Sequence, residues 1–488
     1  MRVLHSAAGK NARAGAESKP SAWPLLPRRR AAAHWYVART RANVRAVDGL
    51  EGQLRLLRAY ALLTYPFVCV PFLWLFFRGN GLDVADYGTV ITVYYVTMFA
   101  ADVPTSILAD RLGQRAMLVA GPALLALGFA TLFCCRSFAG FCAGEALMGF
   151  GHSVLSGPPS TILYELLQRH GAPHRYLQEE ARIHSRRLYG TGTSFLLGGV
   201  LAWLWRDSDG FGYAATILPT SVLCLGASAA ALRLQPLPLR PRLAWRAFAG
   251  SVVADLRLLE VRWLLLYWIV LFALLRYPFH NYQVYLDETA AREPLFGSPL
   301  FAGALYAAMN LAAAPLSRRV PALVERHGRR ALFWGMPLLL AGSLAVMAVA
   351  IAAGDHWPAA ARALAWLGVL MFFVQQVPFG MHWALVQEFV NHRIRPEARS
   401  TVWSVLSLGG RLAYAPVNKG LFALQQGHGT APTLWLAGVA GGIAAALALW
   451  FRPRGLLRDA PTASAPAVSG PKLSGPDLSD PDLSGPDR

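Results

Sequence analysis

The sequence predicts an all-α integral membrane protein in which twelve transmembrane helices form two six-helix bundles, with the N- and C-termini cytoplasmic. Three observations lead to this prediction. The 488-residue chain is 55% hydrophobic and only 15% charged, whereas about a quarter of the residues in a soluble domain are charged. Several apolar runs reach the roughly 20 residues that a helix needs to cross hydrocarbon. A short charged turn also occurs once in each half of the chain.

Each expected helix is an apolar run between charged or turn-forming segments. The fourth and tenth runs are long enough to tilt or to project into the cytosol. The twelve spans are expected at residues 59–77, 84–108, 117–135, 138–164, 188–205, 212–232, 263–285, 300–316, 331–353, 360–390, 401–424 and 432–451.

The distribution of Lys and Arg predicts the orientation of the helices. An even number of spans places both termini on one side, and that side carries 38 of the 46 Lys and Arg residues. The opposite loops carry five, and three lie within spans. Because cytoplasmic loops are enriched in Lys and Arg, both termini are expected in the cytoplasm of a bacterial inner membrane protein.

Composition also excludes several classes of function. The net charge of +19 does not indicate nucleic acid binding, because it is distributed between apolar runs and not over one soluble domain. The five cysteines form no metal-binding spacing, and the chain has no Walker A loop or metalloprotease motif. We therefore expect no cofactor, no metal and no enzymatic activity, with a membrane-embedded enzyme the least favoured class.

Five segments organise the chain. Residues 1–58 form a basic N-terminal tail without the apolar core of a signal peptide, and 59–232 form the first bundle. A Pro- and Arg-rich cytoplasmic linker at 233–262 precedes the second bundle at 263–451. Residues 452–488 end in SGPDL-type repeats, whose composition cannot bury a core. We expect both tails to be disordered.

The charged turn is repeated 215 residues along the chain. The first copy reads Asp110-Arg111-Leu112-Gly113-Gln114-Arg115, and the second reads Glu325-Arg326-His327-Gly328-Arg329-Arg330. The acid, the first arginine, the glycine and the last arginine match, and both copies follow the second span of their half. This recurrence indicates an internal parallel repeat of two six-helix units.

The first copy resembles the signature of the major facilitator superfamily, roughly G-x-x-x-D-R-x-G-R-R/K. Here Ser106 replaces the first glycine and Gln114 replaces a basic residue. Asp102-Val-Pro104 also resembles the E-x-P of many members, and Leu163-Tyr164-Glu165 resembles a motif of one efflux-like branch. Antiporter members of the superfamily carry a Gly-Pro pair in the fifth span, and this pair is absent here. The resemblance implies a transporter of the efflux-like branch.

Local chemistry gives the turn a role beyond topology. Glycine tolerates the positive φ of a tight turn, an acid can accept N–H groups at a helix N-terminus, and arginines can make charge-assisted hydrogen bonds across a mouth. In the superfamily this loop latches the cytoplasmic side of the outward-open state. The expected cytoplasmic gate motif comprises Asp110, Arg111, Gly113, Arg115, Glu325, Arg326, Gly328 and Arg330, with charge-driven topology alone as the alternative.

Polar side chains within the spans predict a central cavity, because polar groups are costly in lipid. Asp102, nearer the cytoplasmic end of its helix, and Glu145, nearer the periplasmic end, are the candidate coupling carboxylates. Arg276 and Arg411 are expected near mid-depth, where each needs an acid, a carbonyl or a substrate anion. The candidate substrate cavity comprises His152, Arg276, His280, Gln283, Asn310, Gln375, His382, Trp383 and Arg411. Structural ion pairs between the halves are the alternative.

These features predict a secondary active transporter that works by alternating access. We expect proton-coupled export of a small amphipathic organic molecule. The alternatives are an importer of an organic anion, favoured by Arg276 and Arg411, and a transport-inactive scaffold or sensor with the same fold. The expected partners are the substrate, H⁺ and the lipid bilayer, with no nucleic acid, and the protein is expected to be a monomer.

Overall fold

The computed structural model describes residues 49–65, 67–208, 211–236, 250, 256–393, 399–453 and 457. Within this part of the chain every regular element is a helix. The expected N-terminal tail as far as residue 48, most of the 233–262 linker and nearly all of the C-terminal tail lie outside the described residues. The α-helices are α2 (Leu50–Thr64), α3 (Leu73–Gly79), α4 (Val84–Leu112), α5 (Gln114–Cys134), α6 (Phe138–Val154), α7 (Pro158–Arg169), α8 (Tyr176–Leu204), α9 (Ile217–Ala231), α11 (Leu259–Thr289), α12 (Pro299–His356), α13 (Ala361–Arg393), α14 (Arg399–His428) and α15 (Thr430–Trp450).

Short 3₁₀ turns connect several of these helices. Each is only three or four residues long, as is usual for this geometry. They are η1 (Val70–Phe72), η2 (Pro173–Arg175), η3 (Ala214–Thr216), η4 (Pro294–Gly297) and η5 (Pro358–Ala360).

Seven helical segments of the described chain are long and apolar enough to cross a membrane. They are Val84–Ala109, Gln114–Cys134, Ala214–Ala231, Pro299–Leu316, Arg319–His356, Pro358–Gln387 and Thr430–Trp450. The long helices α8, α11 and α14 carry more charged residues, among them Arg276 and Arg411. Their lower hydropathy suits helices that face protein more than lipid.

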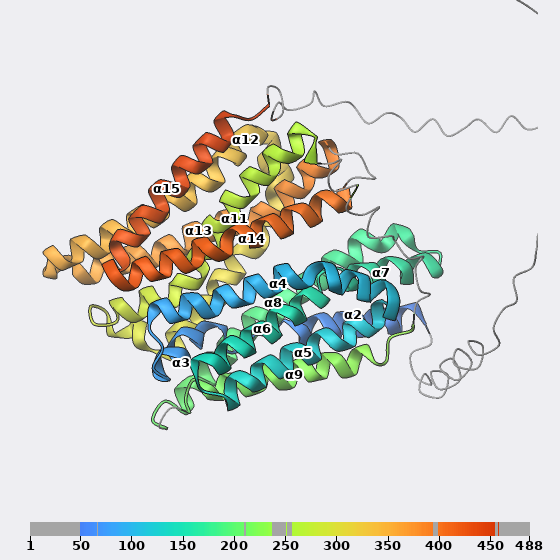
Figure 1. Ribbon diagram of the computed structural model, residues 1–488, viewed down its shortest axis with the longest axis horizontal. Coiled ribbons are helices and arrows are strands. Elements are labelled where there is room, and N and C mark those ends of the chain that lie inside the picture. Colours follow the sequence, from blue (N-terminus) through green and yellow to red (C-terminus); the bar gives the residue numbers. More distant parts are fainter. Residues whose placement is uncertain are drawn as a thin grey trace, which may run out of the picture. The chain divides into compact units, whose positions relative to one another are not determined.

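The helices pack as two groups that follow the order of the chain. In the first group α5 packs on α6 and α9, α4 on α6, and α2 on α8 and α9. In the second group α12 packs on α13 and α15, and α11 on α14 and α15. Figure 1 shows α2–α9 in blue to green and α11–α15 in yellow to red. The groups meet mainly where α4 contacts α14 and where α8 contacts α12.

Two of the expected spans differ from the helices in the structure. The first helix begins at Leu50, within the expected tail, and stops at Thr64 before the chain continues through η1 and α3. The fourth span is divided between α6 and α7, with a break at Ser156-Gly157. Pro158 and Pro159 follow this break, and neither has the N–H group that would continue the helical hydrogen bonds.

The two charged turns have the same backbone conformation. Gly113 has φ 89° and ψ 152°, and Gly328 has φ 78° and ψ 151°. Only glycine occupies this region readily. Gly113 separates α4 from α5, and Gly328 lies within α12, which therefore comprises two helices joined at this residue. The sequence repeat thus corresponds to a structural repeat.

Both turns lie at the same end of the helices. Asn418 donates a hydrogen bond to Gly88, and Thr92 donates one to Ala415. The order of these pairs shows that α4 and α14 run antiparallel, so Gly113 lies near the start of α14. Gln375 of α13 bonds Ser343 in the second part of α12. These two helices run antiparallel, so Gly328 of α12 lies near the end of α13. We call this end the turn end and the other the opposite end.

A buried carboxylate fixes the connection between α11 and α12 at the opposite end. Glu293 accepts hydrogen bonds from the Trp366 indole at 2.9 Å and from Arg362 at 2.7 Å. These two bonds hold the pKa of Glu293 below its ordinary value. The loop is thereby tied to the start of α13.

Candidate functional site

The two groups of helices are bridged at the opposite end by polar contacts between α3 and α11. The Trp74 backbone N–H donates to Gln283 Oε1 at 2.7 Å, and its indole donates to Asp287 Oδ2 at 2.9 Å. Gln283 Nε2 donates to the carbonyl of Val70 at 2.7 Å, and Arg78 forms an ion pair with Asp287. These contacts hold the two groups together.

A cavity lies beside this bridge. Its volume is about 320 Å³, and its lining includes Arg78, Tyr213, Gln283, Asp287 and Phe296. The expected cavity residue Gln283 therefore lines a cavity at the opposite end and not one beside Arg276.

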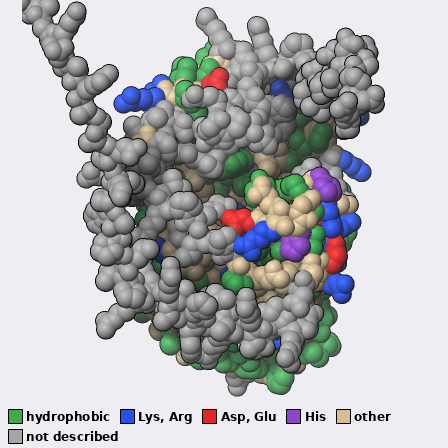
Figure 2. Space-filling model, turned by 90° about the vertical axis from the view of Figure 1, so that its right-hand side faces the viewer, with side chains coloured by type: hydrophobic (Ala, Val, Ile, Leu, Met, Phe, Trp, Pro, Cys, Tyr) green, Lys and Arg blue, Asp and Glu red, His purple; other side chains and the backbone are tan. Residues whose placement is uncertain are grey.

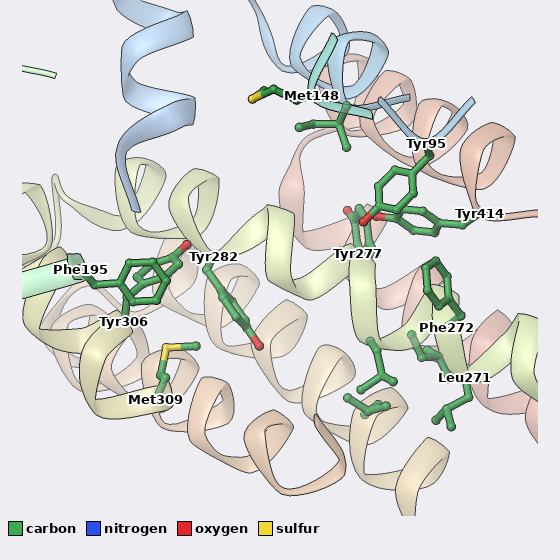
Figure 3. Close-up of a cluster of buried hydrophobic side chains, with 14 of the residues drawn as sticks. Tyr95, Met148, Phe195, Leu271, Phe272, Tyr277, Tyr282, Tyr306, Met309 and Tyr414 are labelled. Carbon is green, nitrogen blue, oxygen red and sulfur yellow. The ribbon is translucent and has the colours of Figure 1, made fainter. Parts of the chain in front are cut away.

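Below the bridge, towards the turn end, aromatic side chains close the boundary between the groups. Tyr95 of α4 hydrogen-bonds His280 Nε2 at 3.1 Å, and the Tyr95 and Tyr414 ring centroids are 4.8 Å apart. Figure 3 shows Tyr95, Tyr414 and Phe272 gathered at this point. His280 thus joins the two groups at the level where the sequence predicted a cavity residue.

Arg276 lies within one helical turn of this aromatic layer. Its guanidinium carbon is 5.3 Å from the Phe272 ring centroid, a cation–π distance. Among the described residues Arg276 forms no ion pair with a carboxylate. It is a partly exposed cation near the middle of its helix.

Arg411 has the partner that Arg276 lacks. It forms an ion pair with Asp102 across the boundary between α14 and α4, and side-chain exposure is 13% for Arg411 and 12% for Asp102. Ser153 of α6 donates a second hydrogen bond to Asp102 at 2.7 Å. The candidate coupling residue Asp102 and the candidate cavity residue Arg411 thus neutralise each other.

Glu145 is the second candidate coupling carboxylate. It lies two turns into α6, it is 4% exposed, and it makes no hydrogen bond or ion pair with any described residue. An isolated buried carboxylate is costly when ionised, so it favours the protonated form or a transient partner. Glu145 is therefore a buried acid and Arg276 a half-buried cation, and neither has an ionic partner among the described residues.

The remaining candidate cavity residues have different surroundings. His152 and His382 each hydrogen-bond a carbonyl of their own helix through Nδ1, at 3.1 and 2.7 Å. Gln375 donates to Ser343 at 2.9 Å inside the second group of helices, so it packs α13 against α12. Asn310 is partly exposed. Trp383 is 52% exposed and packs against Trp403, with ring centroids 4.5 Å apart and an angle of 31° between the ring planes.

At the turn end, Arg115 binds the C-terminus of α9. Its guanidinium donates to the carbonyls of Ala231, at 3.4 Å, and of Leu232. This satisfies carbonyl groups left free at a helix end. Figure 2, which views this end, shows basic, acidic and histidine side chains on the visible surface. The other motif side chains, Arg111, Glu325, Arg326 and Arg330, are exposed, and the Asp110 side chain lies outside what the structure describes.

Sequence reasoning did not single out Trp74, Arg78 and Asp287 as a bridge. No local pattern indicates it, because its partners come from helices more than 200 residues apart. The one available signal was the spacing of Gln283 and Asp287, which places both on one face of α11.

Apolar helices that enclose paired and unpaired charges define a multi-pass membrane protein. The family model described as the Major Facilitator Superfamily matches residues 59–417. The chain therefore belongs to the major facilitator superfamily, and it is a secondary transporter and not an enzyme.

Comparisons with solved structures agree on the fold. A variant of the nucleoside transporter NupG superposes with a TM-score of 0.66 at 16% identity, covering 82% of this chain and 99% of that chain. A POT family transporter in complex with 5-aminolevulinic acid gives 0.64 at 13% identity, covering 83% and 96%. No curated protein sequence is significantly similar to this chain. At these identities the structural likeness establishes the fold alone.

Proposed function

We propose that this protein is a proton-coupled transporter of a small amphipathic organic molecule that carries a negative charge. The observation that carries the proposal is the contrast in charge pairing. Arg411 has Asp102, whereas Arg276 has no carboxylate among the described residues. A cation near the middle of a membrane helix needs a compensating anion, and the substrate supplies it. The rings around Arg276 suit the apolar part of such a molecule.

Protonation of Glu145 couples transport to the proton gradient. Its burial without a partner disfavours the ionised form, so it takes up a proton when its surroundings close and releases it when water or a cation approaches. Arg276 binds the substrate anion while Glu145 carries the proton. Asp102, already paired, maintains the structure between α4 and α14.

Alternating access requires contacts that hold one end of the molecule closed at a time. The bridge of Trp74, Arg78, Gln283 and Asp287 closes the opposite end. The two bundles then rock against each other, which breaks this bridge and closes the turn end. The bundles comprise residues 59–232 and 263–451, and the linker at 233–262 joins them. The motif residues around Gly113 and Gly328, including Asp110 and Arg115, form the gate at that end.

In the same proposal the chain spans a bacterial inner membrane twelve times, with the turn end and both termini in the cytoplasm. The excess of Lys and Arg at that end supports this orientation. The segments before α2 and after α15 then lie on the cytoplasmic side, and the protein acts as a monomer. Export, as in the efflux-like branch, is the proposed direction, and uptake is the alternative.

Proteoliposomes with an imposed pH gradient test this function. A panel of small organic acids, each matched with its neutral amide, is offered together with a pH-sensitive dye inside the vesicles. We expect acids to move in exchange for protons, amides to remain outside, and Glu145→Gln to remove the dependence on the gradient. Wild-type flux that does not depend on the pH gradient contradicts proton coupling. Absence of any flux, with intact binding, favours the scaffold or sensor.

A further inference from the structure

The cavity beside the bridge at the opposite end lies apart from the proposed anion site. Asp287, which lines the cavity, follows Arg276 on α11. At the helical rise per residue, the two are separated by about 16 Å along the helix axis. The contact between Tyr95 and His280 lies at a level between them. A molecule in this cavity therefore does not occupy the anion site.

The cavity has the size of a small-molecule site and open space inside it. Its volume is about 320 Å³, and ligand pockets usually have about 300–1,000 Å³. Gly79 of α3 and Gly297 of η4 belong to its lining. A Cβ added at Gly79 would meet no atom within 4 Å, and one added at Gly297 would first meet the Ala290 Cβ at 3.7 Å. Packed side chains therefore do not fill the space beside these two backbones.

The lining of the cavity carries a cation and an anion side by side. Arg78 and Asp287 form an ion pair, and their side chains are 57% and 17% exposed. Arg78 donates to Asp287 from one nitrogen, and its guanidinium has further N–H groups. Each carboxylate oxygen of Asp287 accepts one hydrogen bond, from Arg78 or from Trp74, and has a second lone pair. Both charged groups therefore retain hydrogen-bonding capacity for a ligand.

Much of the remaining lining is apolar. Such a surface favours a ligand with a hydrophobic body, because contact with it removes apolar area from water. The apolar lining residues are Pro71, Leu75, Leu286, Phe296 and Ala302.

We propose that this cavity is a binding site for an apolar α-amino acid. The carboxylate of the zwitterion binds Arg78, its ammonium group binds Asp287, and its side chain lies against Leu75 and Phe296. Both polar contacts are charge-assisted hydrogen bonds. A purely anionic molecule would be repelled by Asp287, and a purely cationic one would be repelled by Arg78. Only a ligand with both charges on neighbouring atoms matches the pair.

An amino acid bound in the cavity also holds the two groups of helices together. Leu75 and Arg78 belong to the first group, and Asp287 and Phe296 belong to the second. A ligand favours the state in which its contacts exist, so the amino acid stabilises the closed opposite end and slows transport. This regulatory role rests on the proposed function, in which the bridge closes that end, whereas the binding site itself does not.

Three molecules with the same apolar chain test the charge pattern. L-leucine is the zwitterion, 4-methylpentanoate lacks the ammonium group, and 3-methylbutylamine lacks the carboxylate. Equilibrium binding is measured with full-length Arg276→Gln protein in nanodiscs, so that the proposed anion site does not contribute. We expect leucine to bind at least about tenfold more tightly than either analogue, since each analogue loses one charge-assisted contact. Equal binding of leucine and either analogue overturns the assignment.

Matched glycine substitutions test the location. Gly79→Leu places a side chain in the open space and should abolish leucine binding without lowering the melting temperature. Gly420→Leu is the control, because Gly420 is exposed, does not line the cavity and also has no atom within 4 Å of an added Cβ. Leucine binding that survives Gly79→Leu, or that Gly420→Leu removes equally, overturns the site.

Replacement of Arg78 tests the carboxylate contact. Arg78→Gln should reduce the affinity for leucine to that for 3-methylbutylamine. The protein should still fold, because an ion pair with a largely exposed partner contributes little to stability. An unchanged affinity for leucine overturns the assignment of its carboxylate to Arg78.

Hydrogen–deuterium exchange of the wild type tests the regulatory role. Leucine should slow amide exchange in α3 and increase it around Gly113, because the turn end then stays open. Slower exchange in α3 with no change around Gly113 overturns that role.

The remaining outcomes distinguish this site from the proposed function. Leucine that binds the wild type but not Arg276→Gln occupies the proposed anion site, which overturns the cavity site and supports the proposed function. If 2-naphthoate binds the wild type and leucine does not, the cavity site alone is overturned. If neither binds, both proposals are overturned.

Discussion

Arg276 and Arg411 belong to neighbouring helices of the same group, but their surroundings differ. Arg411 is paired with Asp102 across the boundary between the groups, and Ser153 orients that carboxylate. Arg276 contacts the face of Phe272 and forms no ion pair with a carboxylate among the described residues. A paired charge stabilises the protein, whereas an unpaired one is available to a ligand. The predictions below test this difference, beginning with the largest effect.

Replacement of Arg276 should affect ligand binding more than any other change. We expect Arg276→Gln to weaken binding of an organic acid at least about tenfold, the loss of one charge-assisted hydrogen bond, without lowering the melting temperature. Binding in nanodiscs and thermal unfolding in detergent measure the two quantities. A large fall in melting temperature with unchanged affinity would assign Arg276 a structural role instead.

Replacement of Asp102 should affect stability and not ligand affinity. Asp102→Asn leaves Arg411 buried without its partner, which costs about 3 kcal/mol by analogy with broken buried pairs. Adding Arg411→Gln removes the stranded charge and should recover most of the melting temperature. If the double variant is less stable than Asp102→Asn alone, the ion pair does not account for the stabilisation by these two residues.

The two charged turns offer a comparison of equivalent positions. Gly113→Ala and Gly328→Ala should each destabilise the protein by about 1–3 kcal/mol, because both glycines occupy a backbone region that other residues avoid. Gly335→Ala is the control, since it lies in α12 with no atom within 4 Å of the new methyl group. Unequal losses at the two turns would indicate that the repeats differ in more than sequence.

Replacement of Glu293 should change the stability of the protein least, and the change should depend on pH. Its pKa is lowered in the folded state, so the ionised carboxylate contributes stability above the unfolded pKa of about 4.3. This contribution disappears as the pH falls through the folded pKa. Glu293→Gln should therefore lower the melting temperature at pH 7 and have less effect at a pH below the folded pKa. An equal effect at both values would contradict the role of the ionised carboxylate.

The repeated turn could be predicted from the sequence because the residues that define it are adjacent in the chain. Glycine, acid and arginines within six residues define both the motif and the backbone that it adopts. The superfamily followed from the same residues. The helix break before Pro158 also has a local cause, because proline acts on its own helix.

Contacts between distant helices could not be predicted in this way. Asp102 and Arg411 are 309 residues apart, and the sequence offered each several possible partners. Gln375 was expected in a cavity because a polar residue in a span usually faces one. Its amide nitrogen instead donates to Ser343 within the second group, since a polar side chain of a neighbouring helix can accept that hydrogen bond as well as a cavity water can.

The most direct test of the account is the affinity difference between an organic acid and its neutral amide. It is measured in three proteins: the wild type, Arg276→Gln, and the double variant Asp102→Asn with Arg411→Gln. We expect the wild type and the double variant to prefer 2-naphthoate over 2-naphthamide by about tenfold or more, and Arg276→Gln to show no preference. A preference that persists in Arg276→Gln, or that is lost in the double variant, would contradict the claim that Arg276 is the anion site.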